Sequence, residues 1–137
     1  MTDLQIGQGI RQGDVYVLRI ADGELPNGEQ AKPIGKNHVL AYGEATGHCH
    51  ALPKDDCELY SSNVNICKTA KKYGVKEDLA VTHGLRIVVD NTKLLHGTPS
   101  RGFTDPDHTP IDLPKGDYIV LRPREYSDEE EFKIIAD

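Results

Sequence analysis

Asp14-Val15-Tyr16-Val17-Leu18-Arg19-Ile20 is the stretch of sequence that decides the fold. Side chains of a strand alternate between two faces, so Val15 and Val17 share one face while Leu18 and Ile20 share the other. Both faces are therefore largely apolar, which is typical of a strand that is covered on both sides. We expect this strand to be central in a sheet or to lie inside a barrel.

Short runs of strand-forming residues continue along the chain, and turn residues separate them. The thirteen glycines and eight prolines are spread out rather than collected in a linker, a pattern that favours many short strands joined by turns. The expected strands cover residues 38–42, 48–52, 60–68 (weakly), 79–83, 85–90, 118–121 and 132–135. Residues 79–90 read as a hairpin that turns at His83-Gly84, and residues 113–117 as a turn. Residues 69–78 are the one helical segment expected in the middle of the chain.

These elements predict an all-β fold, a small barrel or sandwich of short antiparallel strands. Residues 1–11 show little apolar periodicity and are expected to form an N-terminal arm, which leaves residues 12–137 as a single β domain. A chain of 137 residues is long enough to bury one core without disulfide bonds.

The composition disfavours several classes of function. A net charge of -6 disfavours nucleic-acid binding, which depends on lysine and arginine side chains that neutralise phosphates. The longest apolar runs, such as residues 118–121, are far shorter than the ~20 residues that span a membrane. The three cysteines are odd in number and form no CxxC pair, which favours a reducing compartment. We expect a cytoplasmic protein, or part of a particle assembled inside a cell, without nucleic-acid or membrane partners.

Gly47-His48-Cys49-His50-Ala51 carries the strongest chemical signal in the chain. On a strand, His48 and His50 point to one face and Cys49 to the other. Two neighbouring imidazoles are half of a metal site, because zinc and similar divalent transition metals bind imidazole nitrogen at about 2.0–2.1 Å with three or four ligands. We expect such a metal here, with zinc the best match. The alternative is that both histidines are surface groups or hydrogen-bonded strand residues.

The remaining ligands have to come from elsewhere in the chain. His96 and His108 bound a segment rich in glycine, proline and aspartate, and we expect residues 96–110 to form a loop that folds back toward the histidine pair. Glu44, Asp105 and Asp107 are candidate ligands or partners that fix a histidine tautomer. The predicted site is therefore His48, His50, His96 and His108, and a loop aspartate is the alternative to His96.

The other histidines and the cysteines are expected to be structural. His38 is read as the first residue of a strand and His83 as a turn residue. Cys49 is expected to be a small buried apolar residue. Cys57 and Cys67 are given a structural role, with a Cys–His nucleophile pair as the alternative.

A set of motifs in fixed order covers most of the chain from residue 11 onward. It consists of Arg11-Gln12-Gly13-Asp14-Val15, Gly43-Glu44-Ala45-Thr46-Gly47-His48-Cys49-His50, His96, His108-Thr109-Pro110, Leu113-Pro114-Lys115-Gly116-Asp117-Tyr118 and Arg124-Glu125-Tyr126. In this pattern the chain resembles a family of small, mostly uncharacterised proteins of bacteria and their phages. The resemblance implies that the four histidines of the predicted site are a shared polar set, and it implies no established reaction.

A weaker resemblance links the chain to the cupin superfamily. Gly43, His48, His50 and Asp55 lie near the places of the first cupin motif, a glycine followed by HxH on a strand and then a carboxylate. Pro114-Lys115-Gly116 matches the turn of the second motif, but Ile119 occupies the place of its histidine. The cupin likeness is therefore partial.

Three functions are compatible with these features. The first is a non-catalytic accessory or structural component, such as a phage-particle decoration protein, that self-associates or joins a protein assembly and is stabilised by its metal. The second is a cupin-like metalloenzyme, in which an open metal position activates water against a small molecule. The third is a module that binds a metal or small ligand without turnover. The number of protein ligands discriminates among them, and we favour the first.

Overall fold

The computed structural model describes residues 4–42, 48–99, 102–103, 109–126 and 132–134. The elements follow one another as β1 (Gly9–Gln12), β2 (Val15–Ile20), β3 (Asn37–Tyr42), β4 (Cys49–Pro53), the short 3-10 helix η1 (Lys54–Asp56), β5 (Cys57–Ser61), α1 (Val64–Lys72), β6 (Leu79–Gly97), β7 (Ile111–Tyr126) and β8 (Phe132–Ile134). The all-β class is confirmed, since α1 is the one α-helix in the described part of the chain.

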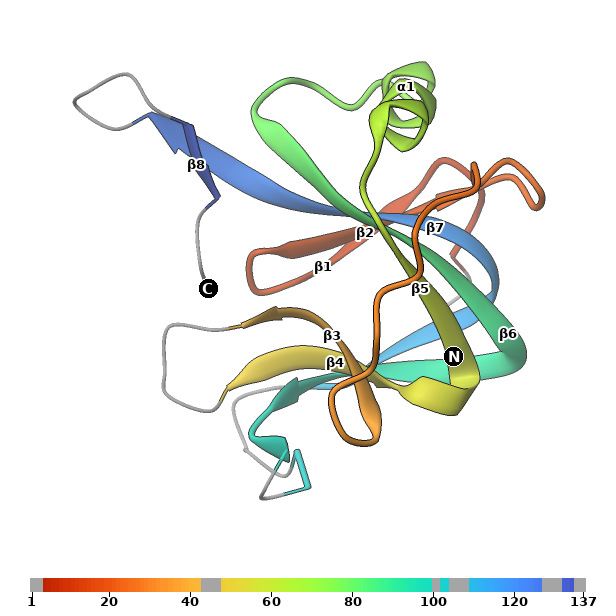
Figure 1. Cartoon of the computed structure of the whole chain (residues 1–137), viewed down its shortest axis with the longest axis vertical. Helices are drawn as coiled ribbons and strands as arrows, with labels where there is room; N and C mark the ends of the chain where they lie inside the picture. Colours follow the sequence, from red (N-terminus) through yellow and green to blue (C-terminus); the bar gives the residue numbers. More distant parts are fainter. Residues whose placement is uncertain (1–3, 43–47, 100–101, 104–108, 127–131, 135–137) are drawn as a thin grey trace.

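The strands form an open antiparallel sheet in the order β1-β2-β7-β6-β4-β3, with β5 on β6 and β8 on β7 (Figure 1). The long β6–β7 hairpin organises this sheet, because its two halves have different neighbours. In one half, which combines the start of β6 with the end of β7, residues 83–87 of β6 pair with β5 and residues 117–121 of β7 pair with β2. In the other half, β4 joins β6 at residues 95–97, and β3 follows β4. A shift in register between Ile87 and Asn91 separates the halves.

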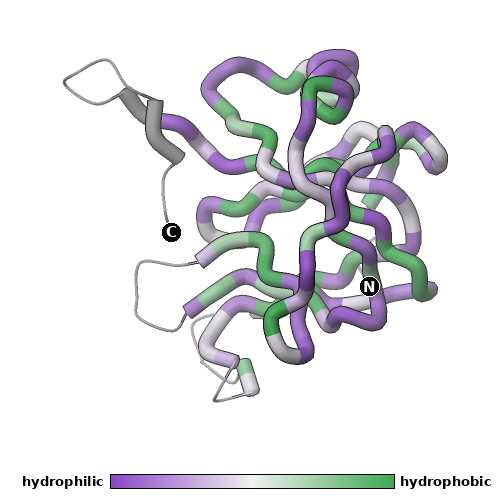
Figure 2. Tube along the Cα trace, in the orientation of Figure 1, coloured by the Kyte–Doolittle hydropathy of each residue, from purple (hydrophilic) through white to green (hydrophobic). Residues whose placement is uncertain are grey.

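Two hydrophobic cores cover β2 from opposite sides. Val15 and Val17 belong to the larger core, in which the β3–β4 part of the sheet packs on β5, β6 and β7. Leu18 and Ile20 belong to a second core, which α1 covers with Ile66. Hydrophobic residues occur along the strands and along α1, with hydrophilic residues between them (Figure 2). The prediction that β2 is a central strand with two apolar faces is confirmed.

The hairpin expected at His83-Gly84 is wrong, because β6 continues through both residues. Close packing leaves no room for a side chain at Gly84. A Cβ atom built on it would lie 2.7 Å from Leu25 Cδ1 and 3.2 Å from Ile66 Cδ1. A glycine within a strand often marks such a close approach rather than a turn.

The helix begins earlier than the sequence pattern suggests. It spans Val64–Lys72, whereas we expect strand up to residue 68 and helix over residues 69–78. The side chain of Asn63 caps the helix, since its Oδ1 accepts a hydrogen bond from the backbone N–H of Ile66 at 2.8 Å. Ile66 and Ala70 are spaced four residues apart and face the second core together.

Two further expectations are corrected. Residues 113–117 are part of β7 rather than a turn; Gly116, at φ 151°, supplies the unusual backbone conformation opposite Ile87. Within the expected arm, residues 9–11 belong to β1 and pair with β2. Leu4 is buried in the larger core, and its carbonyl accepts a hydrogen bond from Arg19 Nη1 at 2.6 Å. From Leu4 onward, the N-terminal segment therefore packs on the sheet.

In the part of the chain that the structure describes, no helix is long and apolar enough to cross a membrane.

Candidate metal centre

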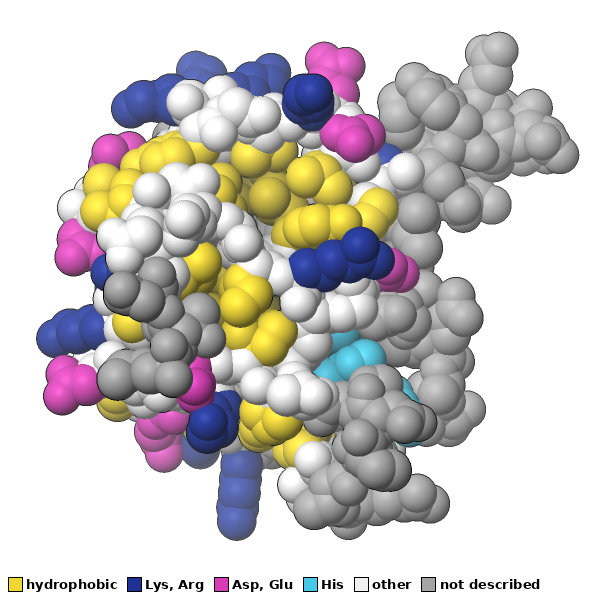
Figure 3. Space-filling view, turned by 180° about the vertical axis from the view of Figure 1, so that it is seen from behind, with side chains coloured by type: hydrophobic (Ala, Val, Ile, Leu, Met, Phe, Trp, Pro, Cys, Tyr) yellow, Lys and Arg dark blue, Asp and Glu magenta, His cyan; other side chains and the backbone are white. Residues whose placement is uncertain are grey.

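Antiparallel pairing of β4 with β6 brings two of the predicted histidines together. His50 pairs with His96 in the ladder, and their rings stack with centroids 3.8 Å apart and planes inclined by 17°. The ring of His48 meets that of His96 edge to face at 6.4 Å. His96 is the penultimate residue of β6 rather than part of a loop, because the strand continues to Gly97. Histidine side chains form a small exposed patch on the rear face of the molecule (Figure 3).

Gln12, at the end of β1, fixes the orientation of the buried His50 ring. Its Oε1 lies 2.9 Å from His50 Nδ1. Its Nε2 donates to two backbone carbonyls, those of Leu94 at 3.0 Å and Thr109 at 3.2 Å. These carbonyls accept only, so they determine which end of the Gln12 amide carries nitrogen and which carries oxygen.

The protonation of the His50 ring follows from this arrangement. Because Gln12 Oε1 is an acceptor, Nδ1 of His50 carries the proton and donates it. In a neutral imidazole the remaining lone pair is then on Nε2. His50 thus has the tautomer of a ligand that binds through Nε2 while its other nitrogen is held by a partner.

Sequence reasoning missed Gln12. The motif at residues 11–15 contains it, but no local pattern connects it with a histidine 38 positions further along the chain. Only the pairing of β1 with β2, and of β4 with β6, brings the two side chains together.

Part of the predicted ligand set lies outside the described residues: His108, Glu44, Asp105 and Asp107. Among the residues that the structure does describe, no group of three or more His, Cys, Asp or Glu side chains is arranged to hold a metal ion. Thr109, the residue after His108, is described, and its carbonyl accepts from Gln12. The backbone next to His108 is therefore bonded to the residue that orients His50.

Of the remaining histidines, His38 is buried and His83 is half-buried in the sheet, and Cys49 and Cys57 are buried as well. Burial lowers the pKa of both His38 in β3 and His83 in β6. Burial likewise raises the pKa of the Cys49 thiol. The pKa of Cys57 rises to about 12 through burial and the neighbouring charges of Asp56 and Glu58. Such a thiol stays protonated at neutral pH, which is unfavourable for a nucleophile.

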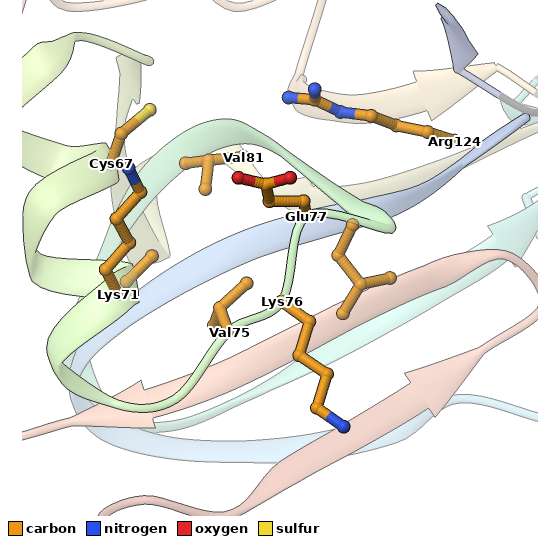
Figure 4. Close-up of a pocket in the computed structure, with 9 residues that line it drawn as sticks. Cys67, Lys71, Val75, Lys76, Glu77, Val81 and Arg124 are labelled. Atoms are coloured by element: carbon orange, nitrogen blue, oxygen red, sulfur yellow. The ribbon is translucent and has the colours of Figure 1, made fainter.

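Cys67 lines a hollow of about 410 Å³ between α1 and the sheet (Figure 4). Its sulfur lies on the helix side near Lys71, and Arg124 reaches in from β7. The described residues that line this hollow include no histidine. Cys67 instead lies 3.6 Å from Ser62 Oγ, so this hollow offers no Cys–His pair.

The cupin-like positions are not gathered around His50. Asp55 is exposed in η1, beyond the end of β4 that lies away from His48. Ile119 is fully buried in the second core, which α1 covers. Neither residue extends the histidine cluster.

A family model matches residues 11–123 of the chain. The chain belongs to this family, described as Domain of unknown function (DUF8820). The DUF8820 match begins directly before Gln12 and contains all four histidines of the predicted site. Comparison with curated proteins and with solved structures finds no match. Membership in an uncharacterised family is thereby confirmed, whereas the finer motif pattern and the cupin resemblance stay predictions.

Proposed function

We propose that the protein is a small metal-binding β domain with a non-catalytic, accessory or structural role. Zinc, or a similar divalent transition metal, binds to His48, His50 and His96. His108 or a carboxylate from the neighbouring segments completes the coordination. The observation that carries this proposal is the hydrogen bond from His50 Nδ1 to Gln12, because it leaves Nε2 as the metal-binding nitrogen.

The donor set suits zinc, but the rings have to rotate. Two imidazoles on one tetrahedral ion, each bound at about 2.0–2.1 Å, have ring centres roughly 5 Å apart. The centres of His50 and His96 are 3.8 Å apart, and those of His48 and His96 are 6.4 Å apart. Metal binding therefore increases the distance between the ring centres of His50 and His96 and decreases the distance between those of His48 and His96. Side-chain rotation supplies both movements without a change in strand pairing.

A structural role follows from the elements that carry the ligands. His48 directly precedes β4, His50 is the second residue of β4, and His96 lies at the end of β6. Only residues 49–51 of β4 pair with β6, so the β3–β4 part of the sheet is held by a short ladder. A metal across this ladder would fasten β3 and β4 to the rest of the sheet, as closed four-ligand zinc sites do.

The edge strand β3 is compatible with a role in an assembly. β3 ends the strand order, and its last residue, Tyr42, is 58% exposed. An edge strand offers backbone groups to a strand of another chain. A second copy of the chain, or a shell protein of a phage particle, is the partner that this role requires.

Zinc titration of metal-free protein, followed by isothermal calorimetry and elemental analysis, tests the proposal. We expect about one zinc ion per chain. His50→Ala and His96→Ala should each weaken binding by at least tenfold, because each removes a ligand. His108→Ala tests whether the segment before Thr109 supplies the fourth ligand.

His38→Ala is the matched control, since it removes a buried histidine of the neighbouring strand β3 that is not a proposed ligand. This variant should bind zinc as the unchanged protein does. If the unchanged protein binds no divalent metal, or if the control loses zinc as the site variants do, the metal proposal is wrong.

A further inference from the structure

A second cavity lies between β3 and the paired strands β6 and β7. It has a volume of about 450 Å³ and is lined by residues 39–42 of β3, Thr82 and His83 of β6, and Arg122 of β7. Pockets for small molecules are typically about 300–1,000 Å³ in volume. The cavity is thus large enough for a small organic molecule.

Irregularities in two strands meet at this cavity. The register of β3 shifts between Val39 and Ala41, and that of β6 shifts between Val81 and His83. β-bulges redirect side chains and are common next to binding sites. Here the register shift of β3 lies on the apolar wall of the cavity, and the register shift of β6 lies on its polar wall.

Arg122 gives the cavity a positive charge. It follows Tyr118 and Val120 along β7 with the two-residue spacing that directs a side chain toward the larger core. Only 9% of Arg122 is exposed. A guanidinium carries five N–H donors in a planar fork, which is why it pairs with carboxylate in two-point geometry.

Hydrogen bonds fix the acceptor nitrogen of His83. The hydroxyl of Thr82 donates to the carbonyl of Val120 at 3.3 Å, so its oxygen accepts from His83 Nδ1 at 3.0 Å. Nδ1 therefore carries the proton, and Nε2 is the acceptor of the ring. Burial lowers the pKa of His83, which favours this neutral form.

We propose that this cavity binds a small organic acid that carries both a carboxylate and a hydroxyl group. Arg122 binds the carboxylate, and His83 Nε2 accepts a hydrogen bond from the hydroxyl group. The apolar body of the ligand lies against residues 39–41. This site is independent of the histidine cluster and of any metal, so it does not depend on the proposed function.

Titration of isotope-labelled protein with 2-hydroxy-4-methylpentanoate, followed by two-dimensional NMR, tests the proposal. The amide of this acid lacks the charge, and 4-methylpentanoate lacks the hydroxyl. We expect saturable shifts at residues of β3, of β6 near His83 and of Arg122 with the hydroxy acid. The amide should bind at least tenfold more weakly, since it forfeits the charged contact with Arg122.

Two variants assign the contacts. Arg122→Gln should reduce the affinity for the hydroxy acid to that of its amide. Arg124→Gln, which removes the exposed arginine two residues further along β7, should leave the affinity unchanged. His83→Phe should remove the preference for the hydroxy acid over 4-methylpentanoate while Arg122 still binds the carboxylate. Dispersed NMR spectra establish that each variant is folded.

Three results would overturn the proposal. One is the absence of saturable binding of the hydroxy acid at millimolar concentration. Another is equal affinity for the acid and its amide. The third is a set of chemical-shift changes that spread over the whole surface. Arg124→Gln would then abolish these changes as fully as Arg122→Gln does. If Arg122→Gln fails to fold, the comparison of ligands and the His83→Phe variant still decide the outcome.

Discussion

Gln12 joins three segments that are far apart in the sequence, because it bonds to His50, to the carbonyl of Leu94 and to that of Thr109. It is 6% exposed, so water does not replace these partners easily. At the scale of single residues, the side-chain amide of Gln12 therefore serves two purposes. The same atoms hold segments of the sheet together and orient the ring of His50.

Gln12→Ala should therefore weaken both metal binding and folding. Loss of the partner of a metal-binding histidine typically lowers affinity by about 10–100-fold. Leaving the two carbonyls and His50 Nδ1 without Gln12 should lower the free energy of unfolding by about 1–3 kcal/mol. Zinc calorimetry and urea denaturation measure the two effects.

Gln12→Glu separates the two effects. A glutamate still accepts from His50 Nδ1, so zinc affinity should stay within about tenfold of the unchanged protein. It cannot donate to the carbonyls of Leu94 and Thr109, so the free energy of unfolding should fall. Equal zinc affinity of the Ala variant and the unchanged protein would show that Gln12 does not orient a metal ligand.

At the scale of elements, the packing of α1 on the sheet depends on a glycine in β6. Gly84→Ala should destabilise the protein by about 1–3 kcal/mol, because the new Cβ meets Leu25 and Ile66 in a filled core. Leu25→Val should recover part of this loss in the double variant, since it shortens the side chain that comes closest. Urea denaturation of the single and double variants gives the interaction free energy between the substitutions at Gly84 and Leu25.

Gly9→Ala is the matched control for Gly84→Ala. Gly9 also lies in a strand, but a Cβ there would meet only Val17 O at 3.7 Å, an ordinary contact. The control should stay within about 0.5 kcal/mol of the unchanged protein. Similar losses for both variants would contradict the packing argument and point to a general cost of side chains at strand glycines.

The start of α1 permits a second test at this scale. Asn63→Ala removes the cap on the N–H of Ile66 and should lower the free energy of unfolding by about 1 kcal/mol. Asn65→Ala changes an exposed position inside the helix, where alanine is the better helix former, and should not destabilise. If the two variants lose equal stability, the side chain of Asn63 does not act as a cap.

The whole molecule shows which features a sequence pattern can reveal. The two apolar faces of β2 are visible in consecutive residues, and so is the spacing of the two histidines in HxH. Gly84 resembles a turn residue, because the side chains of Leu25 and Ile66 that require it come from distant segments. Gln12 is hidden for the same reason, since its partners are 38, 82 and 97 positions away. Local patterns thus predicted strands such as β2, while contacts between distant segments were out of reach.

The pH dependence of stability is a property of the whole fold, and His38 and His83 both contribute to it. Burial lowers the pKa of His38 and of His83 from 6.5. Below about pH 6.5 the unfolded chain takes up protons that the folded protein does not. Stability is therefore complete above this pH and is lost as the pH falls toward the lowered values, by at most about 1.4 kcal/mol per pH unit for each histidine.

Replacing both residues, as His38→Asn and His83→Asn, should flatten this dependence even where it lowers stability at every pH. Urea denaturation between neutral pH and pH 5, with a chelator present, measures the slope of the free energy of unfolding against pH for both proteins. The comparison uses slopes because asparagine also changes packing, and packing shifts the free energy of unfolding without adding a titrating group. An unchanged slope would mean that neither histidine is held neutral by the fold, and the acceptor role assigned to His83 Nε2 would lose its electrostatic support.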